Sequence, residues 1–93
     1  MTPTRYLANP RAVLQTMPDG SAVVLHLETR FYFRLSETGS FLWQQLTTAG
    51  GSTVASLADS LQANFEVDPD EAMKDAETWL AGMLAEQLVV VDG

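Results

Sequence analysis

The spacing of apolar residues along the chain changes once, near residue 36. Before that point two runs rich in branched and aliphatic residues, RAVLQTM and SAVVLHLE, flank the turn sequence PDG. The next run, FYFRLS, alternates between two faces, which are Phe31, Phe33 and Leu35 against Tyr32, Arg34 and Ser36. Because short connections join antiparallel neighbours, the pattern predicts a three-stranded meander with its third strand at an edge.

After Ser36 the apolar residues follow a helical period. A first helix is predicted to run to about Thr48, with an apolar stripe formed by Gly39, Leu42, Trp43 and Leu46. Ser52 or Thr53 caps a second helix, whose apolar face holds Val54, Leu57, Ala58, Leu61 and Phe65. Strands followed by helices predict an α+β fold.

A third helix is predicted from Pro69 to about Gln87, with Asp68 as its cap and Glu71 completing a capping box. Its apolar residues cover about half of its circumference, which is wide for a helix that only covers a sheet. They are Met73, Ala76, Trp79, Leu80, Met83 and Leu84. Either the helix is wedged among its neighbours, or part of this arc lines a groove beside the edge strand. The two explanations can hold together, with Trp79 and Met83 pointing inward, and Met73, Leu80 and Leu84 facing the groove.

The composition of the chain limits which partners and which cellular location can be expected. The 93 residues include 12 acidic and 5 basic side chains, a net charge of −7, which disfavours nucleic acid and anionic membranes as partners. There is no cysteine, no signal peptide and no apolar run that could span a membrane, so we expect a cytoplasmic protein. Residues 1–10 have little periodicity and predict a flexible arm, followed by a single domain over residues 11–93.

The sequence contains little that indicates a catalytic site or a metal-binding site. His26 is the only histidine and lies within an apolar strand, where a structural or solvent-facing role is favoured over a catalytic one. The acidic cluster Asp68, Asp70, Glu71 and Asp75 lacks the spacing of an EF-hand loop, and helix capping explains most of it. No serine lies in a nucleophile motif. We therefore expect no enzyme, no catalytic residue, no metal and no cofactor.

The unprotected edge favours a binding protein instead. The third strand contains no proline and only one charge, Arg34, so its free main-chain groups invite another strand.

A set of motifs in fixed order resembles the PqqD-like family. The segment LSETGSFLW, residues 35–43, is similar to that family's L-N-x-T-G-x-x-I-W, and the likeness continues through GSTV and FEVDPDEA to Leu88 and Val89. It covers residues 11–91. Ser36 replaces the family's asparagine, and Gln87 stands where glycine is common.

The resemblance implies a winged helix-turn-helix-like domain, with a three-stranded antiparallel sheet followed by three helices. Such domains bind the leader of a precursor peptide in natural-product pathways, as a strand added to the third strand against the third helix. By position, the implied peptide-binding residues are Arg30, Phe31, Tyr32, Phe33, Arg34, Leu35, Met73, Glu77, Leu80 and Leu84.

The implied partners are the leader and a separate modifying enzyme, which could be a radical enzyme, a protease or a cyclase. Phe41 is a candidate contact for that enzyme, or equally a residue at the rim of the core. The chain is expected to be a monomer or a weak homodimer, in which Tyr6 and Leu7 lie on the edge strand of another copy. Two alternatives remain: a winged-helix transcription regulator, although the second helix has no Lys or Arg, and an adaptor that binds no leader.

Overall fold

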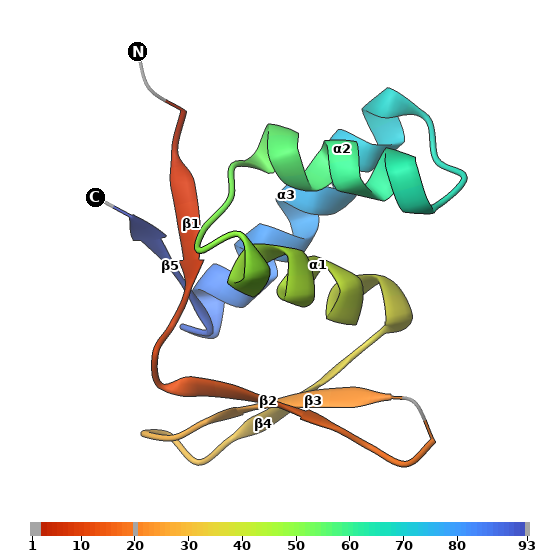
Figure 1. Cartoon of the computed structure of the whole chain (residues 1–93). Coiled ribbons are helices and arrows are strands. Elements are labelled where there is room, and N and C mark those ends of the chain that lie inside the picture. The colour runs from red at the N-terminus through yellow and green to blue at the C-terminus, as the bar shows by residue number, and fades with distance from the viewer. Residues whose placement is uncertain (1–2, 20, 93) are drawn as a thin grey trace.

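The computed structural model describes residues 3–19 and 21–92 (Figure 1). Within them the chain forms two small sheets and three helices. In chain order these are β1 (Arg5–Ala8), β2 (Ala12–Thr16), β3 (Ala22–His26), β4 (Tyr32–Leu35), α1 (Glu37–Thr48), α2 (Val54–Asn64), α3 (Pro69–Ala85) and β5 (Val89–Asp92). None of the helices in the described ranges is long and apolar enough to cross a membrane.

The predicted meander is confirmed. Strands β2, β3 and β4 form an antiparallel sheet in that order, so β4 is an edge strand. Leu35 is buried and Phe33 is half-buried on the face toward the helices, whereas Tyr32 is 72% exposed on the other face. In Figure 1 the three helices lie on one side of this sheet. The alternation read from FYFRLS is therefore the alternation that the sheet displays.

His26 shapes the loop between β3 and β4. Its side chain is 2% exposed, and its Nδ1 accepts hydrogen bonds from the backbone N–H groups of Glu28 and Thr29 at 3.2 and 3.4 Å. The loop includes Arg30, whose φ of 68° lies in the left-handed region. Of the two roles predicted for His26, structural or solvent-facing, the structure shows the structural one.

The predicted caps are also found. The Ser36 hydroxyl accepts from the Gly39 N–H at 3.0 Å and opens α1, and Asp68 accepts from the Glu71 N–H at 2.8 Å and opens α3. Thr53, rather than Ser52, caps α2. Helix α3 ends at Ala85, two residues earlier than predicted.

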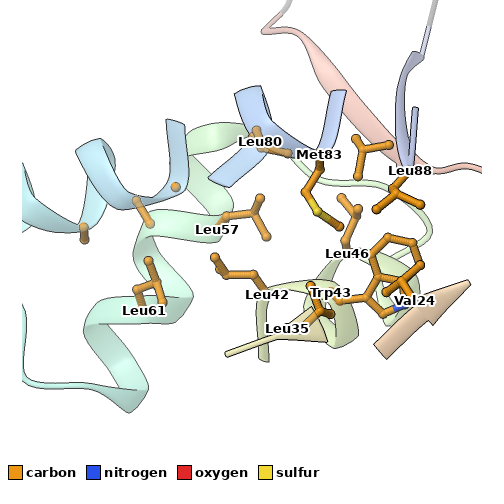
Figure 2. Close-up of a cluster of buried hydrophobic side chains, with 14 residues drawn as sticks. Val24, Leu35, Leu42, Trp43, Leu46, Leu57, Leu61, Leu80, Met83 and Leu88 are labelled. Atoms are coloured by element: carbon orange, nitrogen blue, oxygen red, sulfur yellow. The ribbon is translucent and has the colours of Figure 1, made fainter. Parts of the chain in front are cut away.

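The core lies between the sheet and the helices. Figure 2 shows side chains from all three helices in one cluster with Val24 and Leu35 of the sheet, with Leu80 and Met83 directed inward from α3. Burial of large side chains such as these is the main favourable term in folding. The fully or nearly buried large residues are Val24, Leu35, Leu42, Trp43, Leu46, Leu57, Leu61, Leu80, Met83, Leu88 and Val89.

The N-terminal segment differs from the prediction of a loose arm. Arg5–Ala8 forms β1, which pairs antiparallel with β5, so that Tyr6 lies opposite Val91 (Figure 1). On its other side the Tyr6 N–H donates to the Ser52 carbonyl at 2.7 Å, and the Ser52 N–H donates back at 2.9 Å. The prediction was wrong for these residues because their partners are distant in sequence. Residues 1 and 2 lie outside the described ranges.

This pairing also removes the expected dimer contact. Both main-chain edges of β1 are in use, so Tyr6 and Leu7 are not free to lie on β4 of a second copy.

Candidate functional site

The open edge of β4 presents main-chain groups from alternate residues. The His26 N–H donates to the Phe31 carbonyl at 2.9 Å, which marks the first hydrogen-bonded pair between β3 and β4. Since such pairs alternate along an antiparallel ladder, Phe33 and Leu35 also direct their main-chain groups toward β3. Tyr32 and Arg34 therefore point their N–H and C=O groups away from the sheet. An added strand would bond to these two residues.

A hollow lies directly beside this edge, between β4 and α3. Its volume is about 410 Å³. We call it the edge hollow; its lining residues are Phe33, Arg34, Leu35, Ser36, Gly39, Thr78, Trp79, Gly82, Met83, Glu86 and Leu88. Apolar side chains dominate it, and Arg34 and Glu86 are its charged members. Side chains on the inner face of a strand added to β4 would enter it.

The edge hollow continues along α3. A second hollow of about 520 Å³ shares Ser36, Gly39, Thr78 and Trp79 with it and extends to Lys74 and Asp75. Together the two hollows make a groove that begins at β4 and passes the start of α1. Such a groove fits an extended segment better than a compact small molecule.

Trp79 lies where the two hollows meet, against Gly39. A Cβ built on Gly39 would be 3.2 Å from the Trp79 Nε1 and 3.3 Å from the Ser36 Oγ. Glycine in this first turn therefore lets the indole pack against the α1 backbone. Within the described residues the buried Nε1 of Trp79 has no hydrogen-bond partner.

The structure corrects part of the predicted orientation of α3, although Met83 points into the core as predicted. Leu80 is 2% exposed and belongs to the core, so it does not face the groove, while Trp79 and Met83 line the edge hollow. Met73, Glu77 and Leu84 are absent from the lining of either hollow. By helical geometry these three lie on the opposite flank of the buried stripe.

The α3 residues that line the edge hollow were therefore mostly missed. They are Thr78, Trp79, Gly82, Met83 and Glu86. Their spacing, i, i+1, i+4, i+5 and i+8, marks one face of a helix. That spacing could have identified them as a group, but nothing in it states which flank lies next to β4.

The structure brings together three of the peptide-binding residues that were predicted on the third strand. Phe33, Arg34 and Leu35 line the edge hollow, whereas Phe31 and Tyr32 precede it and are 67% and 72% exposed. Arg30 is exposed in the loop before β4. Among the described residues, neither Arg30 nor Arg34 lies within ion-pair distance of a carboxylate.

Phe41 has a packing role. Its ring meets that of Phe65 edge to face, with centroids 5.2 Å apart. Such pairs stabilise a fold beyond the area they bury. This contact accounts for Phe41 as a residue at the rim of the core.

Metal ligands do not gather in the described part of the chain. Across residues 3–19 and 21–92, no three side chains from His, Asp or Glu come together in a way that could hold an ion. The acidic cluster at the start of α3 includes Asp68, which caps the helix.

The sequence from residue 21 to residue 89 matches the family described as "Coenzyme PQQ synthesis protein D (PqqD)". The chain belongs to the PqqD family. No curated protein matches it. The family match spans β3 to the start of β5, and so includes the edge strand and every α3 residue of the edge hollow.

Two solved structures share the fold of this PqqD-family chain. One is described as "TbiB1 in Complex with the TbiA(beta) Leader Peptide"; it is 25% identical, with a TM-score of 0.79 over 89% of this chain and 93% of that one. The other is described as "Lasso peptide synthetase B1 complexed with the leader peptide"; it is 19% identical, with a TM-score of 0.78 over 91% of this chain and 96% of that one.

Proposed function

We propose that this chain binds the leader of a ribosomally made precursor peptide and presents it to a modifying enzyme on a separate chain. The observation that carries the proposal is an unprotected edge strand lying next to a mostly apolar hollow. Strand addition to such an edge takes affinity from main-chain bonds and selectivity from pockets for alternate side chains. The leader-bound state of TbiB1, which has the same fold, supports it.

The site is the edge of β4 and the face of α3 that lines the edge hollow. Tyr32 and Arg34 supply the main-chain groups, and Trp79, Gly82 and Met83 receive the inward side chains of the leader. A leader that is disordered when free would become ordered on binding.

Charge favours an acidic leader at this edge. Residues 11–36 contain three of the five basic residues and only two acidic ones, whereas residues 37–92 contain ten of the twelve acidic residues. An acidic peptide is therefore repelled by the helices and attracted to Arg30 and Arg34. Its affinity should fall as salt rises.

The first test is a titration of the ¹⁵N-labelled chain with a synthetic peptide. The peptide is one that the unmodified chain retains from a displayed library of random 20-residue peptides. Amide shifts should concentrate in residues 30–36 and at Thr78, Trp79, Gly82, Met83 and Glu86. Shifts centred on Met73, Glu77 and Leu84 would show that the opposite flank of α3 binds, and an unchanged spectrum would refute the proposal.

A proline on the edge strand separates main-chain binding from side-chain binding. Arg34→Pro removes an N–H that points away from β3, so the sheet should persist while leader affinity falls at least tenfold. Arg34→Ala removes the charge but keeps the N–H, and it should lose less affinity than the proline variant. Equal affinity for Arg34→Pro and the unmodified chain, with an unchanged circular dichroism spectrum, would contradict strand addition at β4.

A further inference from the structure

Gly82 lies in the interior of α3 without a packing reason inside this chain. Glycine is the least favourable residue after proline in a helix interior. A Cβ built on Gly82 meets no atom within 4 Å, whereas one built on Gly39 would meet the Trp79 Nε1 at 3.2 Å. The chain's own packing therefore explains Gly39 and leaves Gly82 unexplained.

The place of Gly82 on α3 suggests what the missing side chain makes room for. It lines the edge hollow, between Trp79 one turn before it and Glu86 one turn after it. Met83, beside it in sequence, has its side chain in the core (Figure 2). At Gly82 the wall of the hollow is backbone without a side chain, and the space in front of it is open.

We propose that Gly82 determines which side chain the protein accepts from its peptide, and that the accepted residue is large and apolar. This rests on the proposed leader binding. Alternate side chains of a strand added to β4 face α3, and one of them would sit over the Gly82 backbone, between Trp79 and Met83. Most of the nearby lining is apolar, which selects against a charged residue at this position.

The free protein supplies the first test. Gly82→Ala adds a methyl group into open space and improves helix propensity, so the midpoint of thermal unfolding should rise by about 2–8 °C. A fall in the midpoint would mean that the fold itself needs glycine here, and would overturn the proposal.

Binding supplies the second test, with a displayed library of random 20-residue peptides as the probe. It is selected in parallel on the unmodified chain, on Gly82→Leu and on the control Ala81→Leu, which lies on α3 outside both hollows. The unmodified chain and the control should enrich a large apolar residue at one fixed position. Gly82→Leu should enrich a small residue there and bind the original peptides at least tenfold more weakly, because a buried large apolar side chain is worth at least that much.

The outcomes separate this inference from the proposed function. The unmodified chain could retain no peptide, or only peptides that bind the Arg34→Pro variant equally well. Either result would refute strand addition at β4, and the proposed role of Gly82 with it. If edge-binding peptides are recovered and Gly82→Leu selects the same large residue with unchanged affinity, the proposed function survives and the role of Gly82 is refuted. An equal loss of affinity in Ala81→Leu also refutes it.

Discussion

Gln87 lies just after the C-cap of α3, in a backbone conformation that favours glycine. Its φ is 59°, and two main-chain bonds close the helix around it: the Leu88 N–H donates to the Met83 carbonyl at 2.9 Å, and the Gln87 N–H donates to the Leu84 carbonyl at 3.0 Å. These are the two bonds of the Schellman motif, in which glycine is the usual residue at this position. Its own carbonyl accepts from the Asn9 side chain at 2.7 Å, a bond that no side-chain substitution removes.

Replacing Gln87 with glycine should stabilise the protein. An L-residue in the left-handed region costs roughly 1–2 kcal/mol. Glycine avoids this cost. It also increases the conformational entropy of the unfolded chain, which reduces the gain in stability by about 0.4–1 kcal/mol. The net change in the free energy of unfolding is therefore about 1 kcal/mol, which raises the midpoint of thermal unfolding by about 4–8 °C in a domain of this size.

The assay is thermal unfolding followed by circular dichroism, with Gln87→Ala as the matched control. Alanine removes the exposed side chain but keeps the left-handed cost, so its midpoint should stay close to that of the unmodified chain. A midpoint for Gln87→Gly at or below the unmodified value would refute the reasoning. An equal rise in both variants would also refute it, because the gain would then come from losing the glutamine side chain.

Two further predictions concern the turns. Gly51→Ala should lower the free energy of unfolding, measured with denaturant, by about 2 kcal/mol or more. The φ of Gly51 is +117°, and the new Cβ would lie 2.5 Å from the Leu7 Cδ2 of β1. Gly50→Ala should lower the free energy of unfolding by less, because Gly50 has a φ of +69° and a Cβ there would meet no atom within 4 Å. Equal losses would contradict the clash with β1. Hydrogen bonds from the Ser21 hydroxyl and from its backbone N–H lower the pKa of Asp19 below 3.8, so Ser21→Ala should raise that pKa toward 3.8 in a carboxyl NMR titration. Asp19 has a lower pKa in the folded protein than in the unfolded chain. Its ionised carboxylate therefore stabilises the fold at pH values above the unfolded pKa, and this stabilisation is lost as the pH falls through the folded pKa. If Ser21→Ala leaves the pKa of Asp19 unchanged, the hydrogen bond from the hydroxyl is not the cause of the lowered pKa.

Much of the fold is local and could be predicted from the sequence. Each helix begins with a capping side chain whose bond spans three residues, as Ser36, Thr53 and Asp68 show. The alternation in FYFRLS predicted which residues of β4 face the helices, because strand geometry places neighbours on opposite faces. The edge position of β4 followed from short connections. The β4 half of the site was therefore visible in the sequence.

The rest depends on contacts between distant residues. β1 pairs with β5 at Tyr6 and Val91, near the two ends of the chain, and no periodicity within either segment identifies its partner. In α3, apolar residues flank both sides of the buried stripe, so their pattern alone leaves the rotation of the helix toward β4 undetermined. Packing buries Leu80 and brings Trp79 beside Gly39, and this places Gly82 in the wall of the edge hollow. The sequence by itself determined the meander, the three helices, their caps and the open edge. Only the tertiary structure decided which face of α3 lies beside β4 in the candidate site, because that choice depends on side chains packing across separate elements.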